Sequence, residues 1–220
     1  MDAEAGVAAA TAVGAVVLAA GRSRRMGEAN KLVEPVAGVP MVVRVVDRLL
    51  ASRARPVVVV TGYDSARVER ALGDRRVLIA HNPDFDLGMS TSLRRGIEAL
   101  VGGAGGHRGG GRQDRFGVLV CLGDMPGVET ATVDALIAAF LAAPDDVACV
   151  PAYRGRRGNP VLWGARFLPE VMAVRGDVGA RGLLAEHPEA VLDVPVDDPG
   201  VLLDVDTPDA LHGMEGKESG

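Results

Sequence analysis

Short apolar runs rich in valine alternate along the chain with segments of helical periodicity, and this alternation constrains the fold more than any other feature of the sequence. Runs that are apolar at every position are typical of strands buried on both faces of a parallel sheet. The segments between them place apolar residues three and four positions apart, as helices packed on a sheet do. The expected strands are Val13 to Leu18, Val57 to Thr61, Val77 to Ala80, Phe116 to Leu122 and Val147 to Pro151, and the expected helices are Met41 to Leu50, Ala66 to Leu72, Thr91 to Leu100 and Ala131 to Leu141. This order predicts an α/β fold with right-handed crossovers and a mostly parallel central sheet flanked by helices.

The last third of the chain is less regular. Two further strands are expected at Val161 to Trp163 and at Val191 to Val196, and Asp177 is placed to cap a helix. The short connections between these segments predict a small antiparallel subdomain at one edge of the sheet.

The length of 220 residues suits one compact domain, which we expect over residues 13–212. Small and polar residues in 1–12 and 213–220 predict flexible termini. The glycine density of residues 102–115 predicts a flexible surface loop, although the arginines within it leave a phosphate-binding role as an alternative.

Charge and cysteine content exclude several classes of protein. The formal net charge of −5 gives no reason to expect nucleic-acid binding. The N-terminal segment has neither the positive start of a signal peptide nor an unbroken apolar span, so neither targeting nor a membrane span is expected. The two cysteines, Cys121 and Cys149, lack the spacing of a secreted disulfide framework. A cytoplasmic location is therefore expected.

The loop after the first expected strand is the most informative segment. It reads Leu18-Ala19-Ala20-Gly21-Arg22-Ser23-Arg24-Arg25-Met26-Gly27, with Lys31 shortly after. Glycine lets backbone N–H groups approach an anion, and arginine or lysine neutralises phosphate oxygens, so the loop suits a polyphosphate. The spacing matches neither the dinucleotide fingerprint GxGxxG nor the P-loop. The alternative is an exposed basic loop in which the glycines only make turns.

Carboxylates follow in two places. Asp124 comes directly after the strand that ends at Leu122, and ligands of open α/β sheets bind at that edge. Magnesium prefers oxygen ligands and is usually held by one or two carboxylates together with substrate phosphates, so Asp124 is the first candidate metal ligand. Asp206 is a second candidate. The alternatives are that Asp124 only builds a turn, and that Thr207-Pro208 only starts a final helix.

Three further polar clusters are candidates for ligand contacts. Gly88 to Ser92 precedes a helix, and its hydroxyls can cap that helix or contact a base. Arg156, Arg157 and Asn159 form a second basic loop that could receive an acceptor phosphate, and the segment 176–181 could add contacts to the acceptor. The alternative for such arginines is a solvated turn.

Taken together, these motifs resemble the molybdenum cofactor nucleotidyltransferases, most closely the cytidylyltransferase branch of the MobA-like group. The resemblance runs nearly end to end. It is carried by LAAGRSRRMG with Lys31, GMSTSLRRG at 88–96, LGDMP at 122–126, GRRGNP at 155–160, GDVGAR at 176–181 and DVDTPDAL at 204–211. One position departs from the pattern: Asn159 stands where cytidylyltransferases usually have histidine.

The resemblance implies a Rossmann-like nucleotidyltransferase fold and a set of site residues. It implies Mg²⁺-dependent transfer of CMP from CTP to the terminal phosphate of molybdopterin, and a molybdenum hydroxylase as recipient of the product. Ala20 gives the LAAG form associated with CTP rather than GTP. The implied catalytic residues are Arg25, Lys31 and Asp124, and the metal ligands are Asp124 and Asp206. The implied nucleotide-binding residues are Leu18, Ala19, Ala20, Gly21, Arg22, Ser23, Gly27, Gly88, Ser90 and Ser92, and the acceptor-binding residues are Arg156, Arg157, Asn159, Asp177 and Arg181.

Three other functions stay open from the sequence. The chain could transfer a nucleotide to another phosphorylated acceptor, or carry a finished molybdopterin dinucleotide without catalysis. It could also be an NAD(P)H-dependent oxidoreductase of the type that acts on a nicotine-derived pigment, although it lacks the dinucleotide fingerprint.

Overall fold

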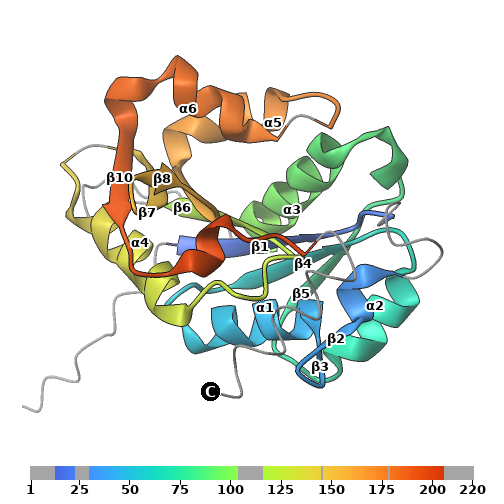
Figure 1. Cartoon of the computed structure of the whole chain (residues 1–220). Coiled ribbons are helices and arrows are strands. Elements are labelled where there is room, and N and C mark those ends of the chain that lie inside the picture. Colours follow the sequence, from blue (N-terminus) through green and yellow to red (C-terminus); the bar gives the residue numbers. More distant parts are fainter. Residues whose placement is uncertain (1–12, 23–29, 104–115, 145, 178, 206–220) are drawn as a thin grey trace, which may run out of the picture.

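A central eight-stranded sheet dominates the computed structural model, which describes residues 13–22, 30–103, 116–144, 146–177 and 179–205 (Figure 1). The strand order is β10-β7-β9-β6-β1-β4-β5, with β8 paired to β7 outside this path. The strands are β1 (Val13–Ala19), β4 (Val57–Thr61), β5 (Leu78–His81), β6 (Gly117–Leu122), β7 (Ala148–Tyr153), β8 (Arg156–Arg157), β9 (Val161–Gly164) and β10 (Val191–Pro195). A separate two-stranded sheet pairs β2 (Pro35–Val36) with β3 (Val39–Pro40).

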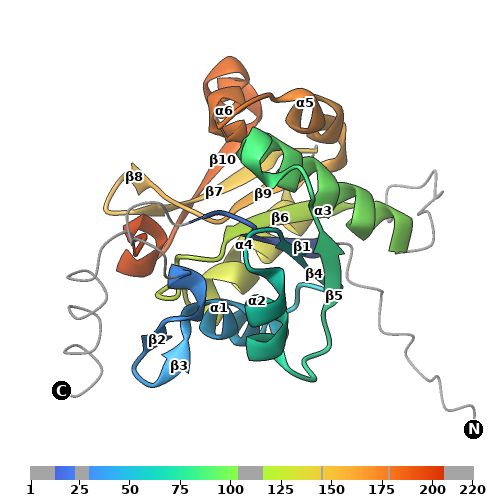
Figure 2. The same ribbon diagram turned by 90° about the vertical axis from the view of Figure 1, so that its right-hand side faces the viewer.

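Helices cover both faces of the central sheet (Figure 2). The α-helices are α1 (Met41–Ala51), α2 (Ser65–Leu72), α3 (Met89–Gly103), α4 (Thr130–Ala142), α5 (Leu168–Ala173) and α6 (Leu183–Glu186). The shorter 3₁₀ helices are η2 (Lys31–Val33), η3 (Phe85–Leu87), η4 (Ala165–Phe167), η5 (Ala180–Gly182), η6 (Pro188–Ala190) and η7 (Pro199–Leu202). Figure 1 shows α3, α5 and α6 above the sheet and α1 and α2 below it.

The two faces of the sheet carry two separate hydrophobic cores, because successive side chains of a strand point to opposite sides. Val17 and Val59 pack with α1, α2 and α4, whereas Val16 and Val60 pack with α3 and α5. These valines are fully buried, which explains why the strands read as continuous apolar runs.

Helix α3 packs directly against the sheet at residue 96, which is glycine. A Cβ at Gly96 would lie 2.3 Å from Cγ1 of Val16 and 2.8 Å from Cγ2 of Val60. This close approach fixes α3 over the central strands, with its first residues at their carboxyl ends.

The chain after β10 returns to the carboxyl edge of the sheet through Asp198, which is 3% exposed. Its Oδ2 accepts hydrogen bonds from the Glu129 N–H (2.9 Å) and the Thr132 hydroxyl (2.7 Å), and its Oδ1 accepts from the Gly200 N–H (2.8 Å). Asp198 therefore ties the start of α4 to η7. The Val205 N–H then donates to the carbonyl of Asp124 at 2.9 Å, so the segment ends beside that residue.

The mostly parallel sheet and the four crossover helices were expected from the sequence and are confirmed, with boundaries that differ by a few residues at most. A small antiparallel sheet is present, but β2 and β3 make it. Val161 to Trp163 instead belongs to β9, which lies inside the central sheet, antiparallel to β6 and β7, and β10 is parallel to β7. All four residues of β9 are buried, as an interior position requires.

Two local expectations differ from the structure. Asp177 begins no helix, because Val174 to Asp177 and Gly179 are irregular and η5 starts only at Ala180. Helix α3 continues to Gly103, so Gly102 and Gly103 are helical rather than part of a loop. Residues 104–115, 1–12 and 213–220 lie outside the described residues.

None of the described helices combines the length and apolar character needed to cross a membrane. Cys121 and Cys149 are both buried and form no disulfide.

Candidate active site

A cleft of about 360 Å³ opens at the carboxyl edge of the sheet, where β1, β6 and the start of α3 converge. Of the residues expected from the sequence, those that line it are Leu18, Ala20, Gly21, Arg22, Lys31, Ser92, Asp124 and Asp177. Leu32, Phe85, Asp86, Met89 and Leu122 also line it and were not singled out. The cleft thus collects residues from four distant parts of the sequence.

Lys31 and Asp124 form an ion pair on one side of the cleft. Nζ of Lys31 lies 2.8 Å from Oδ2 of Asp124, and the two side chains are 11% and 23% exposed. Asp124 follows β6, Lys31 begins η2, and the Gly123 N–H donates to the Leu18 carbonyl of the neighbouring β1 at 3.0 Å. A semi-buried ammonium beside a glycine-lined strand end suits the binding of phosphate oxygens.

The second oxygen of Asp124 fits a divalent cation. Oδ1 is buried and has no hydrogen-bond partner among the residues that the structure describes. A buried carboxylate oxygen without a partner is costly, and oxygen ligands of this kind are the ones that magnesium and similar ions prefer. Asp124 can therefore hold a metal through Oδ1 while Oδ2 stays paired with Lys31.

Arg22 is held at the rim of the cleft by a carboxylate and two aromatic rings. Nη2 of Arg22 lies 2.6 Å from Oδ2 of Asp86, and its guanidinium carbon lies 5.6 Å from the ring centre of Tyr63 and 5.5 Å from that of Phe85. These contacts give an exposed arginine a defined position close to Gly21. Asp86 lies outside the segment 88–92 that the sequence pattern singles out, and its partner Arg22 is 64 positions away in the chain.

A buried asparagine organises the start of α3. The Nδ2 group of Asn82 donates to the hydroxyls of Thr91 and Ser92, each at 2.9 Å, and its Oδ1 accepts from the Asp84 N–H at 3.0 Å. Thr91 also donates to the carbonyl of Gly88 or of Asp84, so it is a hydroxyl that stabilises the helix start. Ser92 faces the cleft. Ser90 is buried and does not line the cleft.

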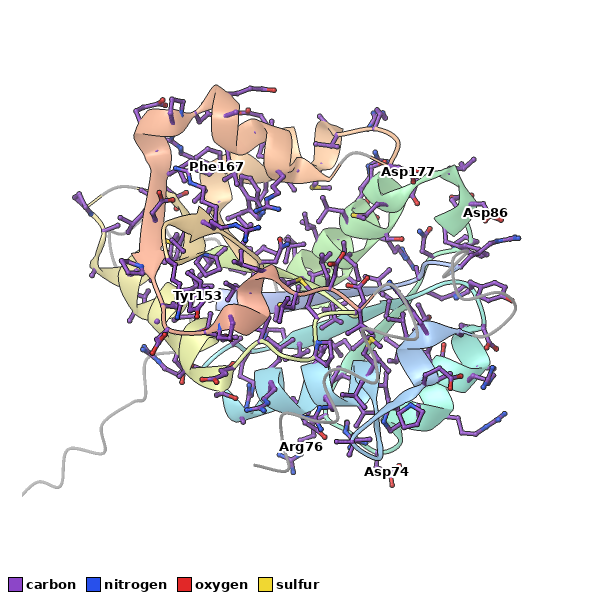
Figure 3. The ribbon with its side chains drawn as sticks, in the orientation of Figure 1. Asp74, Arg76, Asp86, Tyr153, Phe167 and Asp177 are labelled. Atoms are coloured by element: carbon purple, nitrogen blue, oxygen red, sulfur yellow. The ribbon has the colours of Figure 1, made fainter. Side chains whose placement is uncertain are left out.

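Asp177 lies beside this helix start (Figure 3), and hydrogen bonds join residues 176–177 to it. The Ser90 N–H donates to the Gly176 carbonyl at 3.1 Å, and the Met89 N–H donates to Oδ1 of Asp177 at 3.3 Å. Gly88 permits this contact, since its φ is +111° and a Cβ there would lie 2.6 Å from the carbonyl carbon of Gly176. Asp177 thus caps α3 from a distant part of the chain.

The basic loop around β8 lies outside the lining of the main cleft. Arg157 pairs with Asp193, with Nε 2.7 Å from Oδ1, and the Arg181 Nη2 group donates to the Arg157 carbonyl at 2.7 Å. The structure therefore brings Arg157 and Arg181 together, and Arg156 precedes them as an exposed residue. Asn159 lines a separate small apolar cavity of about 20 Å³ with Cys121 and Met125.

Neither cysteine can act as a nucleophile at neutral pH. Burial raises the pKa of Cys121 far above its usual range and that of Cys149 to about 12, so both remain thiols. The remaining candidates Ser23, Arg25, Gly27 and Asp206 lie outside the described residues. Ala19 is buried in the core behind the cleft.

One further group of metal-ligand types lies away from the cleft. Ligand atoms of Glu170, Glu186 and His187 lie within 4.8 Å of one another on α5 and at the end of α6. Nε2 of His187 already contacts Oε2 of Glu170 at 2.7 Å, and this surface pair accounts for the grouping.

A known protein family matches most of the chain. The model described as "MobA-like NTP transferase domain" matches residues 15–191. This range includes most of β1, the cleft residues and β9.

Several curated proteins are similar over nearly their whole length. Nicotine blue oxidoreductase of Paenarthrobacter nicotinovorans is 29% identical over 204 residues, which cover 90% of this chain and 94% of that protein. Purine catabolism protein PucB of Bacillus subtilis is 32% identical over 88% of this chain and 91% of its own. The molybdenum cofactor cytidylyltransferase of Escherichia coli is 26% identical over 90% and 93%.

Solved structures agree with this assignment. Rv0371c of Mycobacterium tuberculosis H37Rv superposes with a TM-score of 0.77 at 26% identity, covering 94% of this chain and 99% of that one. Its complex with manganese gives a TM-score of 0.73 at 24% identity, covering 94% and 99%. A nucleotidyl transferase of Methanothermobacter, Mth528, gives 0.75 at 25% identity, covering 93% and 96%.

Proposed function

Since this chain belongs to the MobA-like NTP transferase family and is a nucleotidyltransferase, we propose that it transfers CMP from CTP to the terminal phosphate of a molybdopterin-type acceptor. The observation that supports the proposal most directly is the Lys31–Asp124 pair at the carboxyl edge of the sheet, where the second, buried oxygen of Asp124 has no partner within the described ranges. The acceptor is proposed from the similarity to the molybdenum cofactor cytidylyltransferase of Escherichia coli, and CTP also from Ala20 in the LAAG loop.

In the proposed reaction an oxygen of the acceptor's terminal phosphate attacks the α-phosphorus of CTP. A new P–O bond forms, the bond between the α-phosphorus and the bridging oxygen breaks, and pyrophosphate leaves with that oxygen. A phosphate monoester has a second pKa of about 6 and is largely ionised at neutral pH, so the attack needs no general base. This agrees with a cleft in which no histidine or thiolate lies among the described lining residues.

The residues of this chain align the reactants and stabilise charge. Lys31 is proposed to stabilise the negative charge that develops on pyrophosphate, and Arg25 is proposed to share that role. Leu18, Ala20 and Gly21 allow the triphosphate to approach the end of β1. Magnesium is the proposed cofactor, held by Asp124 with Asp206, and it would neutralise phosphate oxygens when bound. Val205, which bonds to the Asp124 backbone, brings the chain to this point immediately before Asp206.

The acceptor is proposed to lie on the side of β8, where Arg156, Arg157, Asn159 and Arg181 are found. The Arg157–Asp193 pair is exposed on both sides, so an acceptor phosphate can replace Asp193 at little cost. A molybdenum hydroxylase is the proposed recipient of the dinucleotide.

Pyrophosphate release measures the proposed reaction. The protein is incubated with magnesium and CTP, GTP, ATP or UTP, each with and without molybdenum-loaded molybdopterin. We expect release with CTP that depends on the acceptor. Pyrophosphate release with CTP and a sugar phosphate would show that the acceptor is a different phosphorylated compound. Binding of molybdopterin dinucleotide without any pyrophosphate release would favour a carrier.

The similarity to nicotine blue oxidoreductase supports a second candidate, an NAD(P)H-dependent reduction of a pigment. The first loop lacks the glycine spacing of dinucleotide-binding folds, which makes this the weaker candidate. Oxidation of NADH or NADPH by the purified protein in the presence of such a pigment, followed by absorbance, tests it directly.

A further inference from the structure

The order of the strands gives the cleft two chemically different ends. Asp124 follows β6, whereas Phe85 to Ser92 follow β5, and β1 and β4 lie between these two strands. With about 4.8 Å between neighbouring strands, the two ends are roughly 14 Å apart along the sheet edge. A nucleoside triphosphate bound with its phosphates at Lys31 therefore has its base at the start of α3.

The charge distribution supports this orientation. Lys31 lies at the β6 end, and the Met89 N–H at the start of α3 is already bonded to the carboxylate of Asp177. Asp86 is neutralised by Arg22, but no Lys, Arg or His within the described ranges pairs with Asp177. A carboxylate without a cation disfavours phosphate at this end and favours groups that donate hydrogen bonds.

The polar groups at this end form a defined donor and acceptor pair. Ser92 accepts a hydrogen bond from Asn82, and since the Asn82 Oδ1 accepts from Asp84, the orientation of this amide is fixed. Ser92 makes no hydrogen bond as a side-chain donor among the described residues, so its O–H can point into the cleft. Oδ2 of Asp177 likewise has no partner there and can only accept.

We infer that Asp177 selects the nucleobase, by accepting a hydrogen bond from the 4-amino group of cytosine while Ser92 donates to an acceptor on the same ring. The inference rests on the proposed function and deepens it. Cytosine carries an amino group at position 4 where uracil carries an oxygen, and that oxygen would face the carboxylate without a hydrogen between them. The sequence pattern grouped Asp177 with the acceptor-binding residues, but its contacts are with the segment proposed for the base.

The substitution Asp177→Asn gives a directional test. The Met89 N–H requires an acceptor, so the amide oxygen of the new side chain takes the place of Oδ1 and its NH₂ group points to the base. That group can donate to the 4-oxygen of uracil. We expect CTP to bind wild-type protein at least about tenfold tighter than UTP, and the substitution to reduce this ratio at least about tenfold, because a hydrogen bond to a charged group is exchanged for an unfavourable contact.

Binding of CTP and UTP is measured by isothermal titration calorimetry with magnesium and without acceptor. Asp86→Asn is the matched control, since it removes the same charge from the same cleft and we expect it to change the affinity of both nucleotides equally. Asp177→Ala removes the acceptor without supplying a donor, and we expect it to lower CTP affinity without a gain for UTP. Thermal unfolding of each variant establishes that the protein is folded.

The outcomes separate the inference from the function. If CTP is preferred and Asp177→Asn and Asp177→Ala both leave the ratio unchanged, the inference fails and the proposed function stands. Equal binding of CTP and UTP by wild-type protein also overturns the inference. If folded wild-type protein binds no nucleotide at all, the proposed function and the inference fail together.

Discussion

The two carboxylate oxygens of Asp124 have different roles, because only one of them pairs with Lys31. Oδ2 pairs with Nζ of Lys31, the first residue of η2, and Oδ1 is buried without a hydrogen-bond partner among the described residues, where the proposed cation would bind. This division requires a carboxylate, because an amide at position 124 would offer one oxygen and two N–H donors.

The change Asp124→Asn is expected to lower the rate of pyrophosphate release at least about a hundredfold, since a charge-stabilising group is lost from the reacting end of the cleft. Steady-state kinetics with saturating magnesium measures the effect. Asp197→Asn is the control, because Asp197 is exposed after β10 and does not line the cleft. A rate near that of wild type in the Asp124 variant would remove it from the proposed mechanism.

Lys31→Ala is expected to cause a similar loss, at least about a hundredfold, expressed mainly in kcat because the charge it stabilises develops in the transition state. Arg67→Ala removes a cation from an exposed helical pair and should leave the rate unchanged. An equal effect of both substitutions on kcat would show that the lysine acts only through the total charge.

The position of a single residue could be predicted where it directly follows a strand that the sequence already indicates. The sequence could place Asp124 at the carboxyl edge because it directly follows a buried strand, and the resemblance implied Lys31 as its neighbour in the site; their catalytic roles stay predictions. The ion pair of Arg22 with Asp86, and the capping of α3 by Asp177, could not be predicted, because each joins segments far apart in sequence and depends on the packing of the finished fold.

At the scale of elements, the start of α3 depends on the close approach of two glycine-containing turns. Gly88 has φ +111° and Gly176 has φ +74°, and their backbones meet where any side chain at residue 88 would collide. The same contact sets the position of the segment proposed for base recognition.

Gly88→Ala is therefore expected to destabilise the protein by about 2–4 kcal/mol, from backbone strain and from the collision with the Gly176 backbone. It should also weaken CTP binding. Gly38→Ala is the control, because Gly38 has φ +78° but no atom within 4 Å of the added Cβ, so it reports a positive φ without the collision. Urea denaturation compares the two, and equal losses would contradict the importance of the contact.

The link between α4 and η7 is expected to be as important for stability. Asp198→Ala removes an acceptor of three hydrogen bonds from a buried position, and we expect a loss of about 2–4 kcal/mol in unfolding free energy. Asp193→Ala breaks only the exposed pair with Arg157 and should cost less than about 1 kcal/mol. Chemical denaturation of both variants compares their unfolding free energies. Similar values would mean that water can satisfy the three N–H and O–H groups that Asp198 binds.

The crossover helices and the parallel strands could be predicted because the spacing of apolar residues within each segment indicates its secondary structure. The place of β9 was not, since four buried apolar residues fit an interior strand as well as an edge strand. The antiparallel direction of β9 depends on how the chain passes from β8 into the space between β6 and β7. The residues of β9 alone do not determine that path.

At the scale of the whole molecule, the reactivity of the two cysteines can show whether the sheet stays folded on each side of β9. Cys121 lies in β6 and Cys149 in β7, and burial raises the pKa of both thiols. Because the thiolate is the reactive form and the folded chain excludes the reagent, we expect negligible modification by a disulfide reagent at pH 8. Both should react in denaturant, where the pKa returns to about 8.5. Rapid labelling of one cysteine in native buffer would show that its half of the sheet opens independently.

Strand β9 lies between β6 and β7 although it follows both in the sequence. During synthesis on the ribosome, β6 and β7 are complete while their facing edges still have unpaired N–H and C=O groups, and such edges pair readily with other chains. The two halves of the sheet become one only after Gly164 has emerged. A nascent or truncated chain that stops before Val161 is thus not a smaller version of the domain. It has a sheet of β5, β4, β1 and β6 with an open β6 edge, and a β7–β8 pair that lacks both β9 and β10 as partners. Protection of these edges during translation becomes part of what this protein needs from the cell.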